Sequence, residues 1–250
     1  MKFRHIGILS AMPEEIGTII EDLKDIKKVT FGDLNIYSGK WVNKNNQHIY
    51  LSIAFSGWGK VSAARATTRL IGNNYKNIPV EFILFTGVAG SAQDDINQWD
   101  IVLGKCLIQH DMDATPLFDK LVIPPLKQKE LIPNENILDH LFKRLKNNDL
   151  ISKYSKYGKV KKGIIASGDQ FVSDQESFKK ILSNIPNLSA IEMEGAAFAQ
   201  VSIQEELPWL VIRVISDNAN EGSEDEFSEF VKTYKKCSHQ LITVLVESFI

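Results

Sequence analysis

The chain of 250 residues is short of arginine, cysteine and long apolar runs. Its five arginines are scattered and its formal net charge is −2, so it has no basic stripe to attract nucleic acid or an anionic membrane. Cys106 and Cys237 form neither a disulfide framework nor a CxxC pair, and we expect reduced thiols. No apolar run reaches the roughly 18 residues of a membrane span, and no signal-peptide pattern is present. We therefore expect a soluble, cytoplasmic protein without nucleic-acid or membrane partners.

Several catalytic motifs are also missing. The five histidines include no HExxH and no paired Cys/His spacing, and residues 110–113 are more typical of a loop or a binding contact than of a metal site. There is no GxSxG sequence, which removes support for serine hydrolysis. Residues 57–60 lack Walker A spacing, and residues 86–90 are too short for a dinucleotide fingerprint. The glycines of segment 86–90 suit close backbone approach to a ligand, although tight turns explain them equally well.

Short apolar runs that end in small or polar residues alternate with helical patterns. The runs cover residues 5–9, 49–55, 82–85, 101–108, 163–166 and 210–215. Apolar strands separated by helices predict a mainly parallel sheet covered on both faces, and the length favours one domain over residues 1–250. Ligands in such sheets bind beyond the carboxyl ends of the strands. The polar residues that follow each run therefore mark the expected site.

Four acidic side chains stand at these strand ends, namely Glu15, Glu192, Glu194 and Asp217. A helix dipole, a first helical turn or a loop explains each of them alone. Together they would converge at one sheet edge, where carboxylates in different environments take separate acid and base roles.

Two other segments have distinct patterns. Residues 223–245 carry the apolar spacing of one long amphipathic helix. Residues 111–133 hold four of the eight prolines together with several apolar side chains. A long connection of this kind predicts a functional loop or an interface.

Six segments in one order resemble a known enzyme family. They are residues 8–15, 56–61, 86–90, 166–172, 190–194 and 213–217. The chain is similar to the purine and uridine phosphorylase superfamily in its nucleosidase branch, and within it to the nucleosidases of 5'-methylthioadenosine and S-adenosylhomocysteine. The resemblance implies a three-layer α/β/α sandwich with a twisted, mainly parallel mixed sheet. It also implies a homodimer that uses no metal or organic cofactor.

The resemblance further implies hydrolysis of the N-glycosidic bond of these nucleosides, with 5'-deoxyadenosine as a further candidate, releasing adenine and a 5-substituted ribose. Glu15 would activate water, and Asp217, held by Ser216, would protonate adenine N7. A leaving purine needs such a proton, so burial should raise the pKa of Asp217.

The remaining substrate contacts also follow from the resemblance. They would be Phe171 and Val172 at adenine, Glu192, Met193, Glu194 and Arg213 at the ribose and water, Met12, Trp58 and Phe227 at the 5' substituent, and Gly90 beside the ligand. Part of segment 111–118 would reach the neighbouring subunit's site. Val88 stands where the family often has serine, and Trp58 where it has a smaller aliphatic residue, so the preferred 5' group stays open.

Three alternatives remain. A nucleoside phosphorylase needs an anion site, yet the first loop carries Glu14 and Glu15 and no arginine, and two acids repel phosphate. Arg65 is the only nearby cation candidate, and a surface helix position explains it. A hydrolase of AMP or futalosine-like nucleosides is second, although a 5' phosphate would want basic residues. A non-catalytic nucleoside-binding domain is third, and retention of the site acids argues against it.

Overall fold

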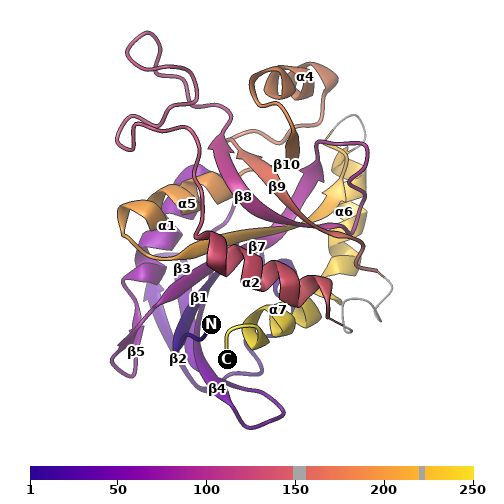
Figure 1. Ribbon diagram of the computed structural model, residues 1–250. Coiled ribbons are helices and arrows are strands. Elements are labelled where there is room, and N and C mark those ends of the chain that lie inside the picture. The colour runs from indigo at the N-terminus through magenta and orange to yellow at the C-terminus, as the bar shows by residue number, and fades with distance from the viewer. Residues whose placement is uncertain (149–155, 220–222) are drawn as a thin grey trace.

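The computed structural model, which describes residues 1–148, 156–219 and 223–250, is built around a nine-stranded mixed sheet (Figure 1). The strand order is β10-β9-β8-β11-β7-β1-β4-β3-β2. The strands are β1 (His5–Ser10), β2 (Lys24–Phe31), β3 (Leu34–Val42), β4 (His48–Phe55), β7 (Phe82–Ser91), β8 (Ile101–Gln109), β9 (Val160–Ser167), β10 (Leu188–Glu192) and β11 (Trp209–Asp217). The short strands β5 (Asn74–Tyr75) and β6 (Ile78–Pro79) pair separately.

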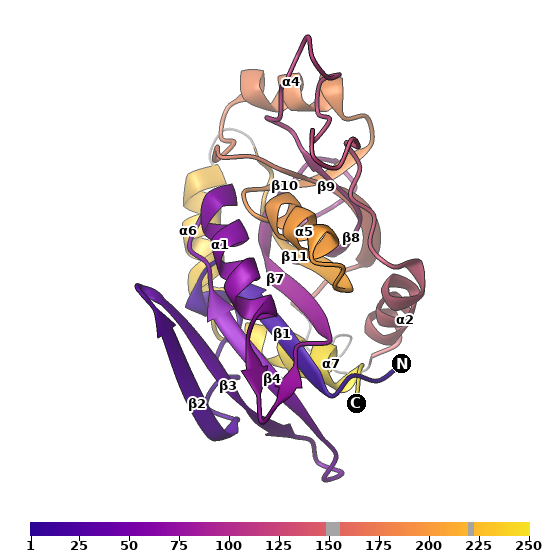
Figure 2. The same ribbon diagram turned by 90° about the vertical axis from the view of Figure 1, so that its left-hand side faces the viewer.

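Helices cover both faces of the sheet. They are η1 (Pro13–Glu15), α1 (Lys60–Ile71), α2 (Glu135–Lys146), α4 (Gln175–Asn184), α5 (Gly195–Gln204), α6 (Ser223–Tyr234) and α7 (Ser238–Glu247). Helices α1 and α5 lie side by side over one face (Figure 2), whereas α2, α6 and α7 pack in the core of the other. The expected fold class, helices flanking a mainly parallel mixed sheet, is confirmed.

The central strands explain this layering. Along β7, Leu84 faces the core under α6 and α7, while its neighbour Phe85 faces the core under α1 and α5. Every position of β11 is buried, as expected for a strand covered on both faces. Because β4, β1, β7 and β11 are parallel neighbours, their carboxyl ends meet at one edge of the sheet.

All six apolar runs are strands, as the sequence predicted. The antiparallel strands β2 and β3 were not predicted, because β2 has an almost fully exposed pattern and lacks an apolar period. Lysines along β2, including Lys27 and Lys28, suit the edge of a sheet, where charge discourages pairing with another chain.

The prediction of one long terminal helix over residues 223–245 is wrong. Helix α6 ends at Tyr234 and α7 begins at Ser238, with a turn in which Cys237 N donates to Tyr234 O at 2.8 Å. The Ser238 hydroxyl donates to Glu14 O at 2.9 Å, which fixes the start of α7 against η1. The break lets both Tyr234 and Leu241 enter the same core.

Residues 111–133, here called the arm, extend away from the sheet as a long irregular loop (Figure 1). Its inner part is anchored, since Ile123 and Leu131 are buried in the core. Its tip exposes apolar side chains, with Leu117 85% and Phe118 37% exposed. Across the described parts of the chain, none of the helices has the length and apolarity needed to cross a bilayer.

Candidate active site

A hollow lies where the carboxyl ends of β1, β7 and β11 meet. It is lined by Ala11, Met12, Glu15, Trp58, Val88, Ala89, Gly90, Gln170, Phe171, Val172, Ile191, Glu192, Met193, Glu194, Ser216, Asp217, Ala219 and Phe227. The structure thus brings together every site residue named from the sequence except Arg213. Five further lining residues were not named from the sequence: Ala11, Ala89, Gln170, Ile191 and Ala219, of which only Gln170 has a polar side chain.

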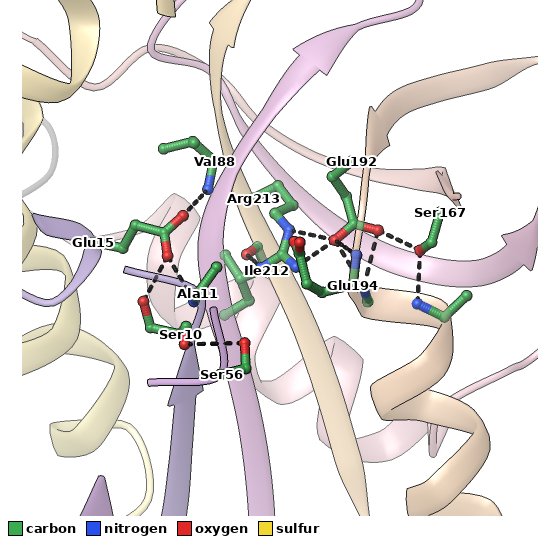
Figure 3. Close-up of polar contacts among 12 residues, drawn as sticks. Ser10, Ala11, Glu15, Ser56, Val88, Ser167, Glu192, Glu194, Ile212 and Arg213 are labelled. Atoms are coloured by element: carbon green, nitrogen blue, oxygen red, sulfur yellow. Dashed lines mark hydrogen bonds and ion pairs between the residues drawn. The ribbon is translucent and has the colours of Figure 1, made fainter. Parts of the chain in front are cut away.

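Glu15 is held rigidly at the end of β1. Pro13 starts the one-turn helix η1, and this turn brings the Glu15 carboxylate back over the strand end. Oε2 accepts from Ser10 Oγ at 2.6 Å and from Ala11 N at 2.8 Å (Figure 3), and it also accepts from Met12 N at 2.9 Å. Oε1 accepts from Val88 N at 3.1 Å.

The surroundings of Glu15 pull its pKa in two directions. Complete burial raises the pKa above its ordinary value, while the charge of Arg213 and the hydrogen bonds from its donors lower it. Four donors and a nearby cation oppose that rise and hold the carboxylate in one place. A fixed carboxylate that faces a cavity is suited to accept a proton.

Asp217 ends β11 in different surroundings. Its Oδ2 accepts from Ser216 Oγ at 2.7 Å, and its Oδ1 accepts from Ala219 N at 2.9 Å. Burial raises the pKa of Asp217, the two hydrogen bonds oppose the rise, and the negative charge of Glu226 adds to it. Among the described residues, no cation opposes this rise. A raised pKa favours the protonated form of Asp217.

Two glycines of β7 make room for these two carboxylates. A Cβ on Gly87 would lie 2.7 Å from Glu15 Oε1 and 2.9 Å from Arg213 Nη1. A Cβ on Gly90 would lie 2.7 Å from both Asp217 Oδ1 and the Ala219 Cβ. The glycines of segment 86–90 are thus explained by close approach of the site acids rather than by a tight turn.

Glu192 and Arg213 form a buried ion pair beside the hollow. Arg213 Nε and Nη2 both donate to Glu192 Oε2, and Ser167 Oγ donates to Oε1 (Figure 3). The guanidinium is 4.3 Å from the centre of the Phe85 ring, a cation–π contact. Arg213 was expected among the substrate contacts, but it stands behind Glu192 and does not line the hollow. From β11 its side chain contacts Glu192 and the Phe85 ring. Its charge can therefore influence a ligand through Glu192 and Glu15.

Glu194 is the third buried acid of the hollow. Burial, followed by the charge of Glu192, raises its pKa to about 8. Gly59 N donates to Glu194 Oε1 at 2.7 Å, which ties the acid to the loop between β4 and α1. Because β10 and α5 meet at this residue, the Glu194 carboxylate reaches the hollow from the side opposite Glu15 (Figure 3).

Three aromatic rings form one wall of the hollow. Phe227 of α6 meets Trp58 edge-on at 6.0 Å between ring centres and Phe171 at 5.8 Å. Trp58 is 51% exposed, so this wall reaches from the interior to the rim. Flat rings of this kind suit the face of a planar ligand.

The close approach at Gly87 and Gly90 yields a stability prediction. Gly87→Ala and Gly90→Ala should each lower the free energy of unfolding by about 1–3 kcal/mol, because the added methyl group forces packed atoms apart. Gly72→Ala is the matched control: its φ is −70° and its Cβ would meet nothing closer than 3.5 Å. That variant should be neutral or slightly stabilising. Urea unfolding of the three proteins measures this, and equal stability of all three would contradict the crowding.

Comparison with known proteins agrees with this geometry. The sequence matches the Phosphorylase superfamily across residues 5–250. A 5'-methylthioadenosine/S-adenosylhomocysteine nucleosidase of Shewanella pealeana is 32% identical, over 97% of this chain and 98% of that protein.

Two solved structures extend the comparison. The 5'-methylthioadenosine/S-adenosylhomocysteine nucleosidase of Neisseria meningitidis, in complex with methylthio-immucillin-A, is 28% identical with a TM-score of 0.85, covering 99% of this chain and 100% of that one. A futalosine hydrolase of Helicobacter pylori is 32% identical with a TM-score of 0.81, covering 98% of each chain. The chain belongs to the phosphorylase superfamily and, within it, to the family of 5'-methylthioadenosine/S-adenosylhomocysteine nucleosidases.

Proposed function

We propose that this chain hydrolyses the N-glycosidic bond of 5'-methylthioadenosine and S-adenosylhomocysteine, releasing adenine and the 5-substituted ribose. One observation carries the proposal: Glu15 and Asp217 line the same hollow, where the charge of Arg213 acts on Glu15 and no cation among the described residues acts on Asp217. Two carboxyls in different surroundings can serve as base and acid in one reaction. The activities named for the relatives above support the same reaction.

In this mechanism Glu15 takes a proton from water as the water attacks the anomeric carbon. Its Oε1 accepts only one hydrogen bond among the described residues, which leaves that oxygen room for water. Asp217 gives its proton to adenine N7 as the bond breaks, while Ser216 and Ala219 hold its oxygens in place. General acid and general base catalysis each contribute typically about 10²–10⁴-fold.

The other lining residues would hold the substrate. Phe171 would stack on adenine and the Val172 backbone would bind the base edge, while Met193 and Glu194 would hold the ribose. The rim, where Met12, Trp58 and Phe227 lie, would take the 5' substituent, and its apolar character favours a thioether.

A phosphate nucleophile or a 5' phosphate finds little support. No lysine or arginine lines the hollow within the described residues, and Arg213 is already paired with Glu192. Arg65 forms an ion pair with Asp33 at 2.7 Å and donates to Phe31 O, so its guanidinium serves other partners. The retained acids also argue against a domain that only binds nucleosides. Futalosine stays a second candidate substrate because of the Helicobacter pylori relative.

The protein would act as a homodimer. Leu117 and Phe118 on the arm are exposed, and so are Trp58 and Val61, which lie on either side of Lys60. The Lys60 ammonium pairs with Asp111 at the root of the arm, so these apolar side chains belong to neighbouring segments. Exposed apolar residues gathered in this way are typical of an interface.

We further propose that the whole chain forms one domain and acts in the cytoplasm, where its free cysteines would stay reduced.

The hydrolase proposal predicts phosphate-independent turnover. Purified protein with 5'-methylthioadenosine in phosphate-free buffer should release adenine at a rate that added phosphate does not increase. Asp217→Asn should lower kcat at least 100-fold because the leaving base is no longer protonated, while its thermal midpoint stays at or above that of the wild type. Adenine release only after phosphate addition would establish a phosphorylase instead. Futalosine, assayed in parallel, tests the second candidate.

The dimer proposal predicts that the arm controls subunit association. Leu117→Lys combined with Phe118→Lys should yield monomers at micromolar concentration in analytical ultracentrifugation, because two charges would enter an apolar contact. Ile26→Lys, which changes a half-exposed residue of β2, is the control and should remain dimeric. Sedimentation of the wild-type protein as a monomer would contradict the dimer proposal.

A further inference from the structure

Three consecutive residues at the end of β8 hold two loops of the hollow together. Gln109 Oε1 accepts from Lys60 Nζ at 3.1 Å. His110 N donates to Ser167 O at 2.9 Å, and its ring packs so closely on Gly168 that a Cβ there would overlap it. Asp111 Oδ2 accepts from Asp169 N at 3.0 Å. From the sequence, residues 110–113 were predicted to be a loop or a binding contact, and residues 111–133 a functional loop or an interface.

Asp111 completes a closed ring of polar contacts. Its Oδ1 pairs with Lys60 Nζ at 2.6 Å, and its Oδ2 binds the Asp169 backbone. The ring closes because Asp169 Oδ1 accepts from Lys60 N at 2.7 Å. The side chain of Lys60 is 17% exposed and that of Asp111 33% exposed, so this ion pair is better shielded than an ordinary surface pair.

The ring joins the two loops that carry the aromatic wall. Lys60 begins α1 directly after the loop of residues 56–59, which presents Trp58. Asp169 lies in the loop of residues 168–172, which presents Phe171 and Val172. None of the three ring residues lines the hollow. Their contacts therefore act on a ligand only through the loops that they fix.

We propose that Asp111 is a positioning residue for the purine half of the substrate. By tying residues 56–60 to residues 168–172, it holds the Phe171 ring and the Val172 backbone at the base before the ligand arrives. Fixing loops in advance raises affinity because binding then costs less conformational entropy. The inference rests on the proposed function, since it assigns these loops to adenine. It predicts that losing Asp111 weakens adenine binding about tenfold, as expected for one charge-assisted hydrogen bond.

The test compares the affinities of the protein for the two reaction products, adenine and 5-methylthioribose. Calorimetry measures the Kd of adenine, and inhibition of turnover measures the affinity for 5-methylthioribose, for the wild type and four variants. Asp111→Asn and Lys60→Met each remove the ion pair from one side, and the double variant measures their coupling. Asp95→Asn is the matched control, because it removes one side of a surface ion pair, with Lys161 at 2.7 Å, and Asp95 does not line the hollow.

Both ring variants should bind adenine about tenfold more weakly and raise KM, with 5-methylthioribose affinity, kcat and the thermal midpoint little changed. The double variant should be no worse than either single one, and Asp95→Asn should match the wild type. Two results would overturn the proposal: an equal loss of affinity for adenine and 5-methylthioribose, or a lowered thermal midpoint with unchanged adenine affinity. Either would mean that the ring of contacts only stabilises the fold. If Asp111→Asn does not fold, Lys60→Met still tests the proposal.

The proposed function and the positioning role fail in different ways. Wild-type protein that neither binds adenine nor hydrolyses 5'-methylthioadenosine would overturn the proposed function. Adenine binding that is equal in all variants would overturn the positioning role alone.

Discussion

The structure depends on burying several carboxylates around one hollow, where Arg213 is the one buried arginine or lysine among the described residues. Arg213 is paired with Glu192, and its charge lowers the pKa of Glu15 but is not among the causes that shift the pKa of Asp217. Burial without full compensation disfavours the charged form and raises the pKa values of Glu15, Glu194 and Asp217. Such carboxyls destabilise the fold near neutral pH relative to apolar residues, which is typical of sites kept for function.

The parallel centre of the sheet makes this arrangement possible. Strands β1, β7 and β11 end at the same edge, so Glu15 and Asp217 approach the central strand from its two sides. That strand accommodates them with glycine, at Gly87 for one acid and at Gly90 for the other. The same crowding of acids leaves no place for a phosphate, which is why water is the nucleophile in our account.

The sequence predicted much of this, and its failures have physical causes. Apolar runs identified the buried strands, but β2 is too exposed to show a period, and the break at Cys237 depends on a tertiary contact of Ser238 with Glu14. The site acids were found because carboxylates at strand ends are conspicuous. The position of Arg213 behind Glu192 and the role of Asp111 were not, because both depend on contacts between residues far apart in the chain.

The pH dependence of kcat/KM for the wild type and Asp217→Asn tests the central claim most directly. Glu15 must be ionised, so the rate should fall as the pH drops through its pKa; Asp217 must be protonated, so the rate should also fall as the pH rises through its pKa. Since burial raises the pKa of Asp217, the basic limb should lie above the ordinary range of an aspartate. Asp217→Asn should be slow and lack that limb. A basic limb of unchanged position in Asp217→Asn would contradict the account.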